Sequence, residues 1–221
     1  MMIKYHLYLS LTISLLLFTC RQDNNADDIV KPEVTETPRI NKSKDKADPD
    51  RYVISDLRAG PFKVGAELPG PTTMMKYQMR IEQRTRHTEE GPVNESITII
   101  SENGEDLLWL KPGLISTNAD YDNTIREIVI ISPKYKTREN IGVGSTIGNF
   151  IKAYPTHGSW YTYVSDMWVV ETPSVQAQFI VDGNDFIGPN PEIKSEQAEL
   201  SILDFRETGK IKSIRIIDFK S

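Results

Sequence analysis

The residues best suited to ligand recognition lie in the aromatic-rich segment 157–168. Tryptophan and tyrosine combine a large apolar ring with a polar atom, and they often anchor binding sites. Neighbouring residues of a β-strand face opposite sides of its sheet, so one side chain of an adjacent pair can face solvent while the other is buried. Aromatic residues also favour strands, which makes ordinary sheet packing the competing and more common interpretation. The sequence predicts a ligand or partner surface formed by His157, Trp160, Tyr161, Tyr163 and Trp168.

Compact catalytic and metal-binding motifs are absent from the sequence. His87 and His157 stand alone, without the His-x-x-His spacing of a metal site or a Gly-x-Ser-x-Gly nucleophile turn. Residues 142–148 are glycine-rich, but the third glycine comes one residue late for a dinucleotide motif, so a tight turn before a helix is favoured. Two Asp-rich turns, 120–123 and 182–185, lack the rest of a calcium loop. We therefore expect no catalytic residue, metal ion or cofactor, while a triad or carboxylate pair assembled only by the fold stays open.

The N-terminus predicts a secreted, lipid-anchored protein. An apolar stretch, residues 7–18, follows Lys4 and is closed by Cys20, the single cysteine of the chain. The stretch is shorter than the roughly 20 residues of a membrane-spanning helix and fits the apolar region of a signal peptide. Its end, residues 17–20, resembles the lipobox of bacterial lipoproteins, in which the cysteine becomes the acylated N-terminus. We expect residues 1–19 to be removed and Cys20 to carry the acyl chains.

The next segment, residues 20–50, is expected to be a disordered tether. Of the thirty residues 21–50, fourteen are charged and none is aromatic, so the segment cannot bury enough apolar surface to fold. The chain has a net charge of −5, which argues against binding to nucleic acid or lying flat on anionic lipid. We expect attachment through the acyl chains alone, in the cell envelope and at the outer membrane, with the membrane face left open.

Residues 51–221 are predicted to form a single β-rich domain. The strand-like segments are 96–100, 106–110, 124–131, 160–170, 175–181, 200–205 and 211–219. Asn103-Gly104 predicts a tight hairpin, and a second hairpin turn is expected at 207–210. Neither face of the last segment, 211–219, is uniformly apolar, as expected near a sheet edge. Residues 146–153 predict a short helix that Pro155 ends, and 74–81 fits either helix or strand. The expected class is α+β, mostly antiparallel sheet with one or two short helices.

A weak internal repeat suggests two duplicated β-rich halves. Gly65 and Gly144 each end a Val-Gly turn and lie 79 residues apart. Ile125 and Ile211 each open an Ile-x-x-Ile-x-Ile strand and lie 86 residues apart. These near-equal offsets fit a duplication, but common strand patterns also produce such matches by coincidence, and both explanations stay open.

Cys20 and the segment 132–155 together resemble uncharacterised Bacteroidota lipoproteins with a core of the form fkT-x-x-GIgVGST…YP. The matching residues are Ser132–Thr137, Gly142–Thr146 and Tyr154–Pro155. Asn140 departs from the pattern, which often has glycine there. The resemblance covers residues 60–219 and implies an envelope lipoprotein, but it implies no activity.

Three functions fit these observations. The first is a non-enzymatic envelope lipoprotein that binds a protein, peptide or glycan, or that serves envelope assembly and maintenance. The second is an envelope hydrolase with carboxylate or Ser/His chemistry, and the third is an inhibitor or immunity-type protein. Because no catalytic motif is visible in the sequence, the first is favoured.

Overall fold

The computed structural model describes residues 48–70, 77–88, 91–114, 121–191 and 195–218. The predicted signal peptide, Cys20 and nearly all of the predicted tether therefore lie outside the described residues. The described residues belong to one compact unit, Asp45–Ser221. No helix among them is long and apolar enough to cross a membrane.

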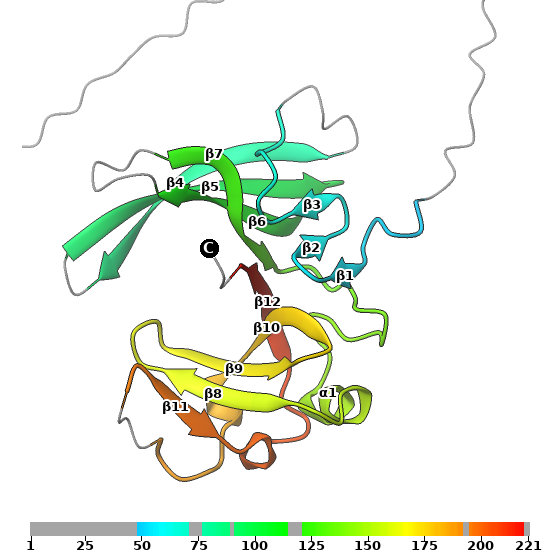
Figure 1. The fold of residues 1–221 in the computed structure, drawn as a ribbon, viewed down its shortest axis with the longest axis vertical. Helices are drawn as coiled ribbons and strands as arrows, with labels where there is room; N and C mark the ends of the chain where they lie inside the picture. Colours follow the sequence, from blue (N-terminus) through cyan, green and yellow to red (C-terminus); the bar gives the residue numbers. More distant parts are fainter. Residues whose placement is uncertain (1–47, 71–76, 89–90, 115–120, 192–194, 219–221) are drawn as a thin grey trace, which may run out of the picture. The chain divides into compact units, whose positions relative to one another are not determined.

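Nine antiparallel strands form one sheet in the order β11-β8-β9-β10-β12-β7-β6-β5-β4 (Figure 1). In that order their bounds are β11 (Gln197–Leu200), β8 (Gly158–Thr162), β9 (Met167–Thr172), β10 (Val175–Val181), β12 (Ile211–Ile217), β7 (Tyr121–Ile130), β6 (Glu105–Leu114), β5 (Gly91–Glu102) and β4 (Gln78–Thr88). A separate small sheet contains β1 (Ile54–Ser55), β2 (Arg58–Ala59) and β3 (Phe62–Lys63). The expectation of an α+β fold made mostly of antiparallel strands is confirmed.

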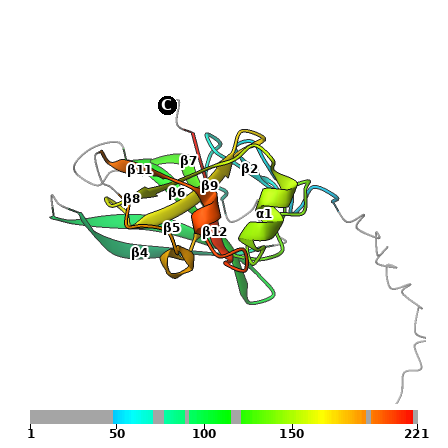
Figure 2. The ribbon, with the colours of Figure 1, turned by 90° about the horizontal axis from the view of Figure 1, so that it is seen from below.

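The predicted short helix is present as α1 (Ile147–Ala153). The side chain of Thr146 accepts a hydrogen bond from the backbone N–H three residues further on, which caps the first turn. Helix α1 lies beside the strands of the large sheet (Figure 2). The ring of Phe150 packs on the ring of Phe179 in β10, with 5.0 Å between their centroids, and this contact holds the helix against the sheet. A single 3-10 turn, η2 (Gly183–Asp185), follows β10.

The prediction of one strand over residues 160–170 is wrong. The segment forms the hairpin of β8 and β9, joined by the turn Tyr163–Asp166. Asp166 adopts a positive φ of 48° in this turn. The turn contains neither glycine nor proline, so the sequence offers no strong turn signal there.

The predicted hairpin between residues 200–205 and 211–219 is also wrong. β11 pairs with β8, and the 3-10 turn η3 (Ile202–Asp204) follows it in place of the predicted strand. β12 pairs with both β10 and β7, so it lies in the middle of the sheet rather than near an edge. The middle of the sheet accommodates Arg215 because its Nε donates to Glu127 Oε1 at 2.7 Å.

The two halves that the weak repeat suggested make equivalent backbone hydrogen bonds. Gly65 N–H donates to the Ile125 carbonyl (2.7 Å), and Ile125 N–H donates back to the residue after Gly65 (2.8 Å). Gly144 N–H donates to the Ile211 carbonyl (2.8 Å), and Ile211 N–H donates back to the residue after Gly144 (2.9 Å). Both glycines have positive φ, 85° and 81°, which glycine adopts without strain. Each half thus begins with the same turn, bonded to its own last strand.

These last strands, β7 and β12, pair with each other where the halves meet. Their register joins Ile128 to Ile216 and Ile130 to Ile214. The 86-residue offset of the repeat relates Ile128 to Ile214 and Ile130 to Ile216. Ile128 therefore pairs with the residue equivalent to Ile130, and Ile130 pairs with the residue equivalent to Ile128. The pairing is therefore pseudo-two-fold symmetric, and its centre is the pair Val129 and Arg215.

One face of the large sheet carries the main apolar core. The four isoleucines of the β7–β12 pair are fully buried there. Helix α1 joins this core through Phe150, and the small sheet joins it through Phe62. Because side chains alternate along a strand, residues such as Val129 and Arg215 lie on the other face, which is called the second face below.

Candidate ligand-binding site

One row of directly opposed residues crosses eight strands on the second face, and we call it the cross-strand row. Its register pairs are Arg80–Ile99, Ile99–Trp109, Trp109–Val129, Val129–Arg215, Arg215–Gln178, Gln178–Glu171 and Glu171–Gly158. Directly opposed residues of neighbouring strands project from the same face of a sheet. The pseudo-two-fold centre divides the row into two halves of four positions each. From the outside inward, the equivalent positions are Arg80 and Gly158, Ile99 and Glu171, Trp109 and Gln178, and Val129 and Arg215.

Charged groups near the centre of the row are paired with one another. Arg215 donates to both carboxylate oxygens of Glu127, with distances of 2.7 and 3.3 Å. The Nζ of Lys111 lies 3.7 Å from a carboxylate oxygen of Glu127 and 3.7 Å from one of Glu95. Arg215 Nη1 also donates to the amide oxygen of Gln178 at 3.3 Å. The guanidinium of Arg215 is thereby held in place by groups of the sheet itself.

The first half of the row is filled by its own side chains. Ile99 is fully buried, and the guanidinium of Arg84 stacks 4.4 Å from the ring centroid of Trp109. Trp109 Nε1 is enclosed and has no hydrogen-bond partner among the described residues. Arg80 donates two hydrogen bonds to Asp106 (2.6 and 2.7 Å), and these lower the pKa of Asp106 to about 2.

The second half of the row opens into two adjoining pockets. The larger, of about 530 Å³, is lined from the segments 156–158 and 171–178. The smaller, of about 450 Å³, is lined from β8, β9, β10 and β11. Gly158, Glu171 and Gln178 line both pockets. A Cβ at Gly158 would lie 3.7 Å from Glu171, which is ordinary van der Waals contact, so this glycine leaves space in the pockets rather than relieving strain.

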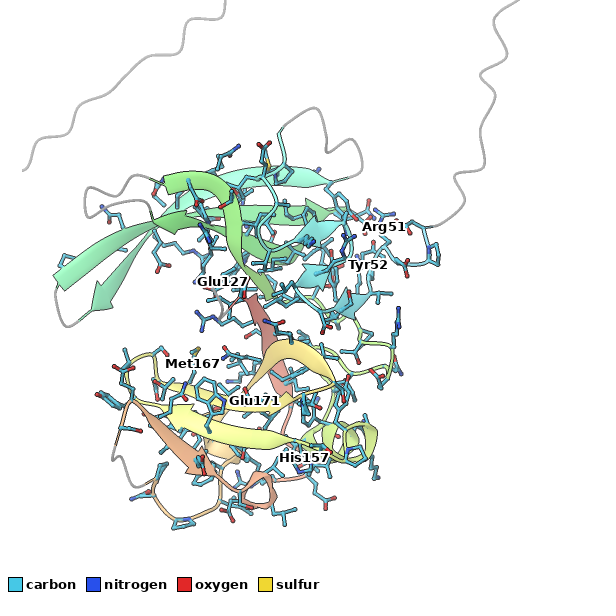
Figure 3. The ribbon with its side chains drawn as sticks, in the orientation of Figure 1. Arg51, Tyr52, Glu127, His157, Met167 and Glu171 are labelled. Carbon is cyan, nitrogen blue, oxygen red and sulfur yellow. The ribbon has the colours of Figure 1, made fainter. Side chains whose placement is uncertain are left out.

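Two polar side chains of these pockets have unused hydrogen-bonding capacity. Glu171, on β9 (Figure 3), forms no hydrogen bond or ion pair with any described residue. Gln178 is only 4% exposed; its amide oxygen accepts from Arg215, and its amide nitrogen has no acceptor within the described part of the chain. An amide nitrogen on a pocket wall without an acceptor from the chain can donate to a ligand that supplies one.

His157 lines the larger pocket from the residue before β8 (Figure 3). Its Nδ1 lies 2.8 Å from the carbonyl oxygen of Tyr154. A carbonyl oxygen only accepts hydrogen bonds, so Nδ1 carries a proton, and in the neutral ring Nε2 is the acceptor. Because this contact orients the ring, His157 can present a fixed acceptor to a ligand.

The structure separates the aromatic surface that the sequence predicts. His157 lines the larger pocket and Trp160 the smaller, although Trp160 is only 9% exposed. Tyr161 and Trp168 project from the core face, where their ring centroids lie 4.5 Å apart and Trp168 also packs on two phenylalanines. Tyr163 is exposed in the turn between β8 and β9. The predicted residues therefore lie in three different environments.

Glu171 and Gln178, the polar residues that both pockets share, were not predicted from the sequence. Gln178 had no distinctive signal, because Gln176 and Gln178 alternate with apolar residues as in an ordinary half-exposed strand. Glu171 had no signal either, because acidic residues near a strand end are common.

The described residues do not assemble a recognisable catalytic or metal centre. No group of three or more His, Cys, Asp or Glu residues within the described part could hold a metal ion. Ser159 lines the smaller pocket, but its hydroxyl donates to the Leu200 carbonyl at 2.8 Å rather than to His157. The arrangement can bind polar groups, and it does not place a nucleophile beside a base.

Comparisons with known proteins bear on the fold. No family model matches the chain, and no curated protein matches it. Among solved structures, the chain is similar to the crystal structure of the uncharacterized protein yfeY from Escherichia coli, with a TM-score of 0.50 and 12% sequence identity. The match covers 75% of this chain and 99% of that chain. At this identity the likeness concerns the fold alone.

Proposed function

We propose that the chain is a lipid-anchored protein of the cell envelope, and that its folded part is a non-enzymatic binding module for an envelope protein, peptide or glycan. Residues 1–19 are the signal peptide, Cys20 carries the acyl chains at the outer membrane, and residues 20–50 form the tether. Stable anchoring by this route needs more than one acyl chain.

The observation that carries the binding role is the pair of adjoining pockets around Gly158, Glu171 and Gln178. Sites for small molecules are concave, occupy roughly 300–1,000 Å³ and present a few polar groups on largely apolar walls. The two pockets fall in this range, and they offer a carboxylate and an amide nitrogen that no described residue occupies. Trp160 and His157 are the predicted ligand residues that lie on their walls.

The test of this proposal is recovery of a bound partner from envelope extract by the full-length chain in mild detergent. Gly158→Val fills the space that both pockets share, and valine suits its strand position. Glu207→Gln is the matched control, because it alters an exposed side chain outside both pocket linings. We expect the wild type and Glu207→Gln to retain the same partner, chemically unchanged, and Gly158→Val to lose it.

Two outcomes would overturn the binding role. Recovery of cleaved envelope polymer that depends on the wild-type pockets would indicate the hydrolase. Capture of an enzyme whose activity falls on binding would indicate the inhibitor or immunity-type protein. The anchoring is tested separately: Cys20→Ser should abolish incorporation of labelled fatty acid and release the chain from the membrane fraction.

A further inference from the structure

We infer that the two pockets bind a cationic amine that carries an oxygen acceptor a few bonds away. The amine faces the Glu171 carboxylate, and the oxygen accepts from the amide nitrogen of Gln178. This inference rests on the proposed binding function and specifies the chemistry of its ligand.

The negative charge of the pocket linings favours a positively charged ligand. Among the residues that line them, Glu171 and Glu199 are the acidic ones, and none is lysine or arginine. Arg215 is the nearest arginine in the cross-strand row, but both oxygens of Glu127 hold its guanidinium. A carboxylate without a cationic partner, at the wall of a partly enclosed pocket, favours a ligand that brings a positive charge.

Gln178 adds a requirement that an acidic wall alone would not impose. Its amide oxygen is engaged by Arg215, and this contact orients the amide nitrogen as the remaining donor. The residue is 96% buried and lines both pockets, so a ligand oxygen placed there can accept a hydrogen bond from this nitrogen. The ligand therefore needs an oxygen acceptor as well as a cation.

The register of the strands fixes how close these two ligand groups must be. Glu171 and Gln178 are directly opposed on β9 and β10. The Cβ atoms of such a pair lie about 4.5–5.5 Å apart. An ammonium and a hydroxyl or carbonyl oxygen separated by two or three bonds match this spacing. Amino sugars and the N-termini of peptides share that arrangement.

The first half of the sheet supports the assignment by contrast. The positions equivalent to Glu171 and Gln178 hold Ile99 and Trp109, and Ile99 is fully buried. A polar pair is thus not needed to form this kind of strand pairing. The carboxylate and amide are features of the second half, where Gly158 also leaves space beside them.

The experiment is calorimetric titration of the full-length chain in mild detergent with two amine probes and their neutral counterparts. D-glucosamine and glycylglycinamide carry the amine beside an oxygen acceptor. N-acetyl-D-glucosamine and N-acetylglycylglycinamide lack the charge but carry an added acetyl group, so the Glu171→Gln variant supplies the test of the charge at unchanged ligand size. Comparison of the sugar with the peptide arm identifies the source of the amine.

We expect at least one amine probe to bind about tenfold more tightly than its acetylated counterpart, as a charge-assisted contact implies. Glu171→Gln and Gly158→Val should weaken that binding by about the same factor, whereas Glu207→Gln should leave it unchanged. Circular dichroism of each variant confirms that it is folded.

Either of two results would overturn the inference. One is equal affinity for amine and acetylated probes, or for the wild type and Glu171→Gln. The other is no binding of either amine probe to the wild type. In both cases the proposed binding function is judged independently, by whether the envelope partner is still retained by the wild type and lost by Gly158→Val.

Discussion

The two halves of the sheet share a turn and a strand pairing, and they differ in the side chains that the cross-strand row presents. Beside the pseudo-two-fold centre, the first half has Trp109 and then Ile99, whereas the second has Gln178 and then Glu171. The backbone hydrogen bonds of the two leading turns are the same to within 0.1 Å (2.7 and 2.8 Å, then 2.8 and 2.9 Å). The backbone pairing therefore does not determine whether this face is filled or open, and the side chains do.

The second half also contains elements without an equivalent in the described part of the first. β11 supplies Gln197 and Glu199 to the smaller pocket, and the segment after α1 supplies His157 to the larger one. The pockets thus depend on two additions to the repeated unit as well as on the row.

The largest expected effect comes from exchanging residues between equivalent positions of the row. Ile99→Glu places a carboxylate in a fully buried site without a cationic partner, and we expect a loss of about 4 kcal/mol of unfolding free energy. The reciprocal change, Glu171→Ile, removes an unpaired carboxylate from an open pocket and should stay within about 1 kcal/mol. Urea unfolding followed by circular dichroism measures both, and similar losses would contradict the difference between the halves.

The second prediction compares equivalent core residues. Phe179 opposes Ile214, as Leu110 opposes Ile128 in the first half, and both side chains are fully buried. Phe179 additionally holds helix α1 through Phe150. We expect Phe179→Ala to lower the free energy of unfolding by about 4 kcal/mol and Leu110→Ala by about 3 kcal/mol. Amide exchange should show that only Phe179→Ala loosens α1; protection of α1 equal to the wild type would argue against this coupling.

The third prediction tests the equivalence of the leading turns. Gly65 and Gly144 both have positive φ, and a Cβ at either would meet no atom within 4 Å. Alanine there pays only the backbone strain of the left-handed conformation, so each substitution should destabilise by about 1–2 kcal/mol. Thermal unfolding should give the same shift for both variants, and a clearly unequal pair would weaken the case for a duplicated unit.

The smallest expected effects are changes of stability with pH. One titrating group of the second half loses its contribution at alkaline pH, and one of the first half loses its contribution at acidic pH. Burial and the nearby Glu139 raise the pKa of Tyr154, in the second half, to about 12, although its contact with Thr137 opposes this. Since the neutral form is favoured in the folded chain, its contribution is present below pH 10 and about 1 kcal/mol is lost by pH 11. In the first half, hydrogen bonds from Arg80 and Ser101 lower the pKa of Asp106 to about 2, so its contribution is lost as the pH falls from about 4 toward 2.

Unfolding free energies measured from pH 9 to pH 11 test the alkaline effect. Tyr154→Phe lacks the titrating hydroxyl and should show a flatter pH dependence over this range than the wild type. A slope unchanged in Tyr154→Phe would assign the alkaline loss to other groups. Asp106→Asn is the corresponding variant for the acidic range.

Local features of the fold could be predicted where a residue type imposes a conformation. The apolar stripe through Ile147 and Phe150, followed by Pro155, correctly predicted the helix. Asn103 and Gly104 adopt the positive φ values of a tight hairpin, 53° and 80°, as their types indicated. The turn at Tyr163–Asp166 was missed, because only the environment of the hairpin makes Asp166 adopt a positive φ.

The candidate site could be predicted only in part, because it depends on strand pairing over long sequence distances. Trp160 and His157 were selected by residue type and both line a pocket. Glu171 belongs to the site because strand pairing places it opposite Gln178 and Gly158. Gln178 belongs to it because its amide is oriented by Arg215, 37 residues further along the chain. No property of those residues in isolation specifies which strand lies beside which.

Thiol labelling tests most directly whether the row is open in the second half and closed in the first. The chain has a single cysteine, Cys20, so a Cys20→Ser background permits one new thiol at a time. Glu171→Cys and Ile99→Cys then place a thiol at equivalent positions of the two halves, and a maleimide reagent reports the exposure of each. We expect Glu171→Cys to react at least about a hundredfold faster, because the thiol at position 99 reacts only when the sheet opens locally. Equal labelling rates in the two folded variants would contradict the distinction between a filled and an open half.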